Sequence, residues 1–280
     1  MTRNVWLVAN RASGGNDDAA LEAVLIALDR AGLAPLRTIG LPEDPLPTRD
    51  VLEASAVDLL VTFTGDGTAN AALLPLEGWA GEALVLPGGT QNLLARSLHG
   101  ERSADEIVAA FDRLQPTRRH LVSNRHGHGL CEIVVGPGAT WSEVREALRA
   151  RDIAELAATA RDAVAQTAAG PGVRLVDPPL GNPEGYPAVR LYPVEGAIAI
   201  DGYGADSLAD YARQGLAILQ RDFRAGPHDE LGRHRAVTCR SDAPIELMID
   251  GERATGAREE RFVVAPFGVT LLAHPDREPE

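Results

Sequence analysis

Short apolar runs alternate with helix-like patterns over the first part of the chain. Three mainly apolar runs are candidates for buried strands, and each enters a glycine-containing loop: 5–9, 58–63 and 83–86. Apolar residues at helical spacing follow the first loop, and helix-prone stretches follow the other two, at 69–74 and 93–98. Strand, loop and helix in repetition predict a parallel sheet whose loops lie at the carboxyl ends of the strands. We therefore expect a Rossmann-like α/β domain over residues 1–116.

The pattern changes after Pro116. Strand-like segments now stand between polar and proline- or glycine-rich stretches: 131–135, 197–200 and 245–249. A helical region from 141 to about 168 interrupts them. The runs 261–265 and 269–272 predict a terminal hairpin around Pro266-Phe267-Gly268. We expect the second domain, residues 117–280, to be a mostly β sandwich with a helical insertion.

Composition excludes several classes of function. Forty acidic and 27 basic residues give the 280-residue chain a formal charge of −13, which argues against a general nucleic-acid binder. The chain has no lysine, which excludes Schiff-base chemistry and the lysine-bearing P-loop. Cys131 and Cys239 show no metal-ligand spacing and fit a reducing compartment. No apolar run approaches the roughly 20 residues of a membrane-spanning helix, so we expect a cytoplasmic protein whose membrane contact, at the inner face, is peripheral.

The three glycine loops carry the candidate chemistry. Glycine lets backbone N–H groups turn toward an anion, and the helix that follows each loop adds its positive end. A phosphate-rich ligand such as a nucleotide is the natural occupant of three such loops. Asp66 stands between two glycines, where a carboxylate can hold phosphate-bound Mg²⁺ or accept a proton. A purely turn-forming aspartate is the alternative.

These loops resemble the signatures of a known family. Asn10 to Gly14, Thr64 to Asn70 and Pro87 to Arg96 resemble the three signatures of the diacylglycerol kinase catalytic domain. That family includes bacterial diacylglycerol kinases and sphingosine kinases, and it is more distantly similar to NAD kinases. A fourth segment, Ile249-Asp-Gly-Glu252, is similar to the family's Asp-Gly-Glu turn. Residues 120–245 match the family only loosely.

The resemblance implies roles for individual residues. Glu252 would accept the proton of the substrate hydroxyl with Asp250 beside it, and Asp66 would coordinate catalytic Mg²⁺ or share the base role. A structural metal site of bacterial members falls on Glu195, where the family has aspartate. Arg96 is a candidate for neutralising phosphate, with a surface helix cation as its alternative. The implied ATP contacts are Asn10, Arg11, Ala12, Ser13, Gly14, Thr38, Thr64, Gly65, Asp66, Gly67, Thr68, Ala69, Asn70 and Thr90.

Three positions depart from the family pattern. Arg11 stands where a proline is usual, and Thr64 replaces the first glycine of its loop. A β-branched residue at position 64 requires an ordinary negative φ. Gly89 before Thr90 is expected to loosen the third loop. None of these changes removes a chemical group that phosphoryl transfer needs.

Together these features predict an ATP- and Mg²⁺-dependent lipid kinase of phospholipid metabolism. Its acceptor would be a lipid alcohol, either diacylglycerol-like or a long-chain base. Two alternatives stay open: a kinase of a soluble alcohol, including a NAD kinase, and a non-catalytic nucleotide-binding regulator. We expect no nucleic-acid partner, and a homodimer is one candidate assembly.

Overall fold

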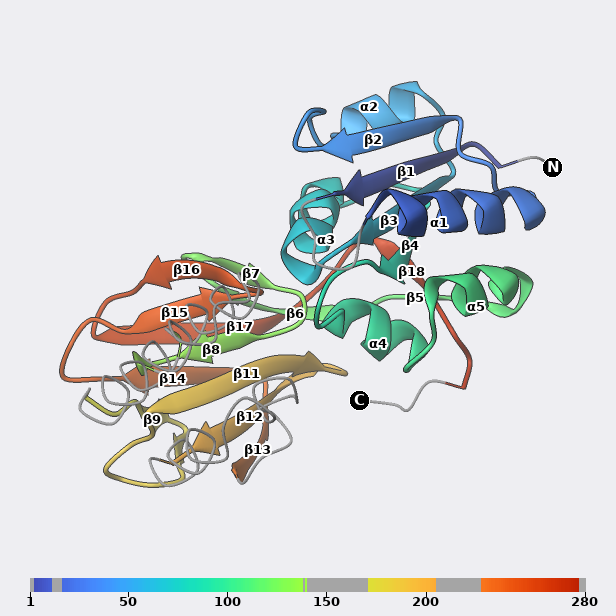
Figure 1. Ribbon diagram of the computed structural model, residues 1–280. Helices are drawn as coiled ribbons and strands as arrows, with labels where there is room; N and C mark the ends of the chain where they lie inside the picture. Colours follow the sequence, from blue (N-terminus) through green and yellow to red (C-terminus); the bar gives the residue numbers. More distant parts are fainter. Residues whose placement is uncertain (1–2, 12–16, 138, 140–170, 205–227, 277–280) are drawn as a thin grey trace, which may run out of the picture. The chain divides into compact units, whose positions relative to one another are not determined.

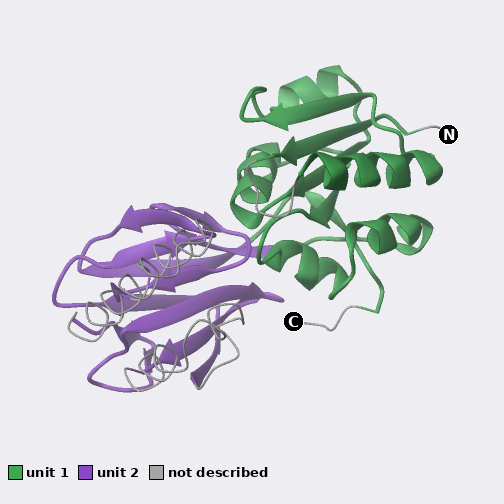
Figure 2. Ribbon diagram, viewed as in Figure 1, with its two compact units in different colours: residues 1–119, 266–280 green, residues 120–265 purple. Residues whose placement is uncertain are grey.

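The structure is a computed structural model that describes residues 3–11, 17–137, 139, 171–204 and 228–276 (Figure 1). The chain forms two compact units. Unit 1 comprises Met1–Arg119 and Pro266–Glu280, and unit 2 comprises His120–Ala265 (Figure 2). The helical insertion predicted at 141–168 lies outside the described residues, as do Ala12, Ser13 and Gly14. No helix among the described residues is long and apolar enough to cross a membrane.

Unit 1 is built on a six-stranded sheet in the order β2-β1-β3-β4-β18-β5. Its first five strands are parallel to their neighbours, and β5 is antiparallel to β18. The strands are β1 (Val5–Asn10), β2 (Arg37–Leu41), β3 (Leu59–Thr64), β4 (Glu82–Pro87), β5 (Gln115–Thr117) and β18 (Thr270–Ala273). The helices are α1 (Asp18–Arg30), α2 (Arg49–Ala54), α3 (Asp66–Leu73), α4 (Leu93–His99) and α5 (Ala104–Ala109), with single 3₁₀ turns η1 (Leu74–Leu76) and η2 (Phe111–Arg113).

Local sequence explains where these helices begin and how they pack. Ser103 and Glu106 form a capping box that starts α5, and Asp17 caps α1 by accepting the Ala20 N–H. Val24 and Leu28 of α1 share one buried core with Ile107 of α5 and with the sheet. Helices α1 and α5 therefore cover the same face of the sheet (Figure 1).

Unit 2 is a sandwich of two six-stranded sheets whose neighbouring strands run antiparallel wherever the pairing is described. The first sheet has the order β10-β9-β14-β17-β6-β7 and the second the order β13-β12-β11-β8-β15-β16. The strands are β6 (His120–Asn124), β7 (Gly127–Gly129), β8 (Ile133–Val135), β9 (Arg174–Asp177), β10 (Pro179–Leu180), β11 (Ala188–Val194), β12 (Ala197–Tyr203), β13 (Asp229–His234), β14 (Ala236–Arg240), β15 (Glu246–Ile249), β16 (Glu252–Thr255) and β17 (Glu259–Pro266). Val237 and Phe262 of the first sheet share a buried core with Leu191 and Leu247 of the second.

The predicted terminal hairpin is wrong. Strand β17 pairs with β14 in the sandwich, whereas β18 lies between β4 and β5 in unit 1. Leu271 and Leu272 are both buried, which is typical of a strand that is covered on both faces. An apolar run specifies that it is buried but not which distant strand it joins, so the run itself did not reveal this return to unit 1.

Candidate functional site

The three glycine loops of unit 1 meet at one edge of its sheet. Strand β3 lies between β1 and β4, with Ala9 opposite Phe63 and Thr64 opposite Pro87. All three strands are parallel, so their carboxyl ends and the loops that follow them are adjacent. The predicted clustering of the loops is therefore present within unit 1.

Side chains from these loops join one loop to the next. Asn10 Nδ2 donates to Thr68 Oγ1 at 2.8 Å, which ties the end of β1 to helix α3. Asp66 is the first residue of α3, and its Oδ1 accepts the Leu94 N–H of α4 at 3.0 Å. The Asp66 carboxylate thus caps a neighbouring helix, a structural role that its position between two glycines did not indicate.

The loop after β4 is held tightly, contrary to the expectation that Gly89 loosens it. A Cβ at Gly88 would lie 2.7 Å from the Thr64 nitrogen, and one at Gly89 would lie 2.5 Å from the Gly65 Cα. Glycine is required at both positions because two backbones cross there. Asn92 closes the same loop: its Oδ1 accepts the Gly89 N–H at 2.6 Å and its Nδ2 donates to the Gly89 carbonyl at 2.9 Å.

Asn92 was not among the site residues predicted from the sequence, although its residue type was a usable signal. It adopts φ +52°, in the left-handed region, directly before α4. Asparagine is one of the few residues that enter this region readily. Thr64, in contrast, is absent from the residues with positive φ, so the ordinary backbone conformation required of it is confirmed.

Two predicted nucleotide contacts lie away from the loops within unit 1. Thr38 pairs with Leu7 in the sheet, whereas Asn10 pairs with Leu41, so Thr38 stands three residues before the loop edge. At about 3.3 Å per residue that separation is roughly 10 Å. Arg96 binds Glu101, which follows the C-terminal end of α4, with Nε donating to Oε1 at 2.7 Å. This pair fits the alternative of a surface helix cation.

The remaining predicted contacts of unit 1 stay on the loops. Thr90 is exposed on the loop after β4, and Arg11, exposed at the end of β1, lies 3.5 Å from the Asp18 carboxylate. Gly65, Gly67, Thr68, Ala69 and Asn70 occupy the start of α3. Unit 1 therefore gathers most of the described nucleotide candidates around the N-terminus of one helix.

The Asp-Gly-Glu segment forms the tip of a hairpin in unit 2. Strands β15 and β16 pair with Ile249 opposite Glu252, which leaves Asp250 and Gly251 as a two-residue turn. Their φ values are +46° and +95°, the signs that a type I′ hairpin turn needs. Glu252, the first residue of β16, is exposed and carries the carboxylate at this tip.

The side chain of Asp250, one of the two turn residues, is buried, and its carboxylate accepts hydrogen bonds from backbone N–H groups. Three N–H groups donate to it: Leu130 at 2.6 Å, Cys131 at 3.0 Å and Glu132 at 2.7 Å. Burial raises the pKa of Asp250 to about 7, although the three N–H donors favour the charged form. Asp250 therefore fixes the turn that carries Glu252.

Glu195, the predicted ligand of a structural metal ion, lies in a turn of unit 2. Glu195 is exposed in the turn between β11 and β12, next to Gly196 with φ +68°. No group of three or more histidine, cysteine, aspartate or glutamate side chains able to hold a metal ion exists among the described residues.

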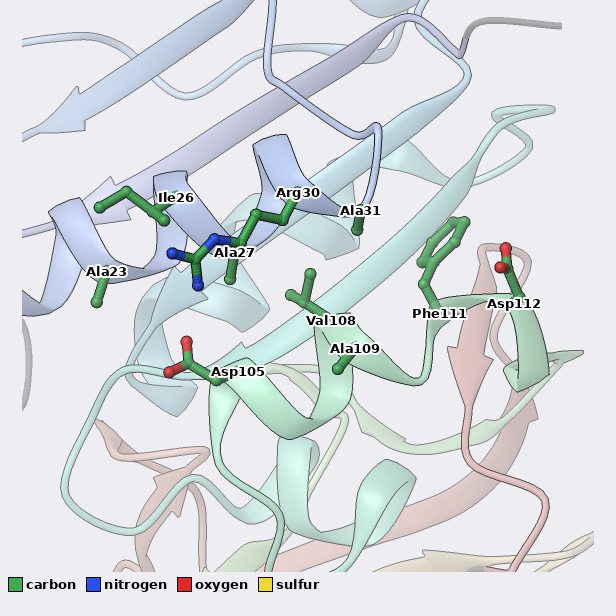
Figure 3. Close-up of a pocket in the computed structure, with 10 residues that line it drawn as sticks. All are labelled: Ala23, Ile26, Ala27, Arg30, Ala31, Asp105, Val108, Ala109, Phe111 and Asp112. Carbon is green, nitrogen blue, oxygen red and sulfur yellow. The ribbon is translucent and has the colours of Figure 1, made fainter.

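A separate groove lies between α1 and α5. Its lining includes Ile26, Arg30, Val108 and Phe111, and its volume is about 740 Å³ (Figure 3). Ile26 and Arg30 belong to α1, Val108 belongs to α5 and Phe111 to the turn η2 after it, whereas the glycine loops lie at the carboxyl edge of the sheet. The groove is therefore distinct from the loop site of unit 1.

Fold and site together define a class of protein. The fold is a parallel α/β sheet with glycine loops at its carboxyl edge, in a chain that continues into an antiparallel sandwich, and it is similar to the fold of solved diacylglycerol kinase structures. Residues 4–123 match the family model described as diacylglycerol kinase catalytic domain. A search of curated proteins gave no match.

Comparison with solved structures concerns the fold. A candidate diacylglycerol kinase from Bacillus anthracis str. Sterne aligns over 99% of both chains with 17% identity and a TM-score of 0.65. A diacylglycerol kinase from the same source aligns over 98% of this chain and 97% of its own, with 18% identity and a TM-score of 0.63. Yeast NADH kinase is more distant, with 11% identity over 98% of this chain and 84% of its own and a TM-score of 0.49. At these identities the likeness establishes the fold.

Proposed function

We propose that the protein is an ATP- and Mg²⁺-dependent kinase that phosphorylates a hydroxyl of a lipid alcohol, either diacylglycerol-like or a long-chain base. One observation carries the proposal. Three glycine loops converge at one sheet edge within a domain that matches the diacylglycerol kinase family model. Phosphoryl transfer asks a protein mainly for positioning and for neutralisation of charge, and such loops provide both.

The start of α3 fits a nucleotide phosphate. Helices α1, α2 and α5 each have a side chain that caps their first turn, from Asp17, Thr48 and Ser103. The N-cap residue of helix α3 is Gly65, which has no side chain to cap the helix. A phosphate oxygen can take the place of that cap, because the first-turn N–H groups and the helix dipole both favour an anion. Asn10 and Thr68 add polar side chains beside this position.

Asp66 is the residue in unit 1 that fits Mg²⁺. Magnesium in kinases is commonly held by one or two carboxylates together with the substrate phosphates, so it needs no dedicated protein cage. Bound there, the ion would neutralise charge on the transferring phosphate. Asp66 presents its carboxylate at the first turn of α3, beside the position proposed for the phosphates.

Glu252 is the proposed proton acceptor for the substrate hydroxyl. It lies at an exposed hairpin tip, and the buried Asp250 holds that tip through three backbone N–H groups. A general base must keep a fixed position to act, and the type I′ turn with its buried anchor supplies that rigidity. In this proposal the nucleotide-binding residues belong to unit 1 and the base belongs to unit 2.

The experiment is a transfer assay with the purified full chain. Labelled ATP and Mg²⁺ are offered with diacylglycerol or sphingosine in mixed micelles, and separately with NAD. Mg²⁺-dependent labelling of a lipid but not of NAD supports the proposal, whereas labelling of NAD alone supports a soluble-alcohol kinase. Absence of transfer to every acceptor refutes both.

A non-catalytic nucleotide-binding protein is the second candidate. It is favoured by one contact, in which Asp66 Oδ1 already accepts the Leu94 N–H and so has a structural use. Titration calorimetry with ATP distinguishes this candidate from the kinase. ATP binding without transfer to any alcohol of the panel supports it, and Mg²⁺-dependent transfer excludes it.

A further inference from the structure

A row of charged side chains crosses the second sheet of the sandwich. Arg190 on β11 donates from Nε to Glu132 Oε2 at 2.8 Å, and its Nη1 lies 3.5 Å from Asp201 Oδ2 on β12. The side chains of Glu132 and Asp201 are only 5% and 6% exposed, and that of Arg190 is 16% exposed. Charged groups at this depth are stable only when they are paired and hydrogen-bonded.

The row lies on the sheet face that points away from the sandwich core. Ile133, Leu191 and Ile200 belong to the core between the two sheets. Arg190 and Asp201 each stand next to one of these residues on their strands, and successive side chains on a strand point to opposite faces. Glu132, just before β8, binds the Arg190 side chain. The Arg190 guanidinium also lies 4.1 Å from the centre of the Tyr192 ring, which further restricts its position.

Glu132 joins this row to the turn that carries Glu252. Its backbone N–H donates to Asp250 Oδ1 at 2.7 Å, and its carbonyl accepts the Asp250 N–H at 3.1 Å. The same residue therefore holds Asp250 through its backbone and Arg190 through its side chain. Gly129, just before this loop, has no room for a Cβ, which would lie 2.9 Å from the Glu132 carbonyl oxygen.

We infer that Arg190 and Glu132 are positioning residues for Glu252, an inference that rests on the proposed kinase function. Arg190 fixes the Glu132 side chain, and the Glu132 backbone fixes Asp250, two residues before Glu252. Loss of the guanidinium removes a buried charge-assisted hydrogen bond from Glu132 and frees the loop that holds the turn. Neither residue touches substrate in this account; both act through the hairpin tip.

The test compares Arg190→Met with a matched variant, Arg174→Met. Arg174, on β9 of the same unit, donates to Asp242 at 2.7 Å and has no link to the hairpin turn among the described contacts. In Arg190→Met we expect kcat to fall by about 10- to 100-fold, the size of effect that a small misplacement of a catalytic group produces. The KM for ATP should stay within about twofold, because the nucleotide loops belong to unit 1. Amide hydrogen exchange should accelerate in the peptides 128–134 and 247–253, and Arg174→Met should show neither change.

Each outcome decides the inference separately from the kinase proposal. If Arg190→Met matches Arg174→Met in both kcat and exchange, the inference is wrong. If the wild-type protein transfers phosphate to no acceptor, the kinase proposal fails. Amide hydrogen exchange alone then decides whether Arg190 is linked to the turn. Faster exchange in 247–253 then supports the link to the turn, and unchanged exchange there overturns it. If Arg190→Met does not fold, Glu132→Gln, which preserves side-chain volume, is measured by the same criteria.

Discussion

Gly89 stands where the loops after β3 and β4 cross, and its substitution tests how closely these loops must pack. Alanine at position 89 would place its Cβ 2.5 Å from the Gly65 Cα and 3.2 Å from Asn92 Oδ1. Ordinary van der Waals contact begins at 3.4 Å, so the backbones must separate by about 0.9 Å. The first of these contacts is with backbone, which cannot move aside as a flexible side chain can.

The residue displaced is Gly65, the N-cap residue of α3. Forced overpacking of this kind costs about 1–3 kcal/mol of folding free energy. For a protein of this size each kcal/mol lowers the Tm by about 2–4 °C, so we expect Gly89→Ala to lose roughly 2–12 °C. Because Gly65 moves as well, ATP affinity should fall together with stability.

The assay is thermal unfolding with and without ATP and Mg²⁺, joined to calorimetric titration of ATP. Gly40→Ala is the matched control in the same unit, since its Cβ would lie 3.9 Å from the nearest atom, Asp44 Oδ2. That variant should stay within about 0.5 kcal/mol of the wild type. If Gly89→Ala unfolds like Gly40→Ala and binds ATP with unchanged affinity, the close crossing of the loops has no importance for the site.

Substitutions at two further residues, Asp66 and Asp250, separate structural from chemical roles. Asp66→Asn keeps an oxygen that can accept the Leu94 N–H, so its Tm should stay near that of the wild type, whereas the lost charge should abolish transfer. Asp66→Ala should abolish transfer and also lose about 1 kcal/mol of stability. Equal Tm values for the two variants would argue against a capping role of Asp66. Burial raises the pKa of Asp250 to about 7, so its folded form binds the proton more tightly than its unfolded form. The stability it contributes is therefore present below about pH 4 and lost as the pH rises to about 7. In urea unfolding, the stability of the wild type relative to Asp250→Asn should fall between about pH 4 and pH 7, and a constant difference contradicts the shift.

Much of unit 1 could be predicted from local pattern. The runs 5–9, 58–63 and 83–86 correspond to β1, β3 and β4 within a residue or two, because buried parallel strands have continuous apolar sequences. The Ser103–Glu106 capping box is also confirmed, since it depends only on residues three apart. Features that depend on neighbouring residues could therefore be predicted from the sequence.

Features that depend on contacts between distant parts of the sequence could not be predicted. The strands that pair with β18 lie far away in the sequence, and the residues Val269 to Leu272 do not specify which strands these are. The burial of Asp250 depends on three N–H groups about 120 residues earlier in the chain. The tight packing at Gly89 likewise follows from its crossing with Gly65, whereas the sequence alone indicated a looser loop.

The most direct test of the central claim is phosphate transfer by Glu252→Gln beside Glu246→Gln. Glu246 lies on the same β15–β16 hairpin, paired with Thr255, and carries no proposed role in the reaction. We expect Glu252→Gln to lower kcat for the lipid acceptor by about 10²- to 10⁴-fold, the usual contribution of a general base, while Glu246→Gln keeps wild-type turnover. Equal turnover by the two variants would contradict the account.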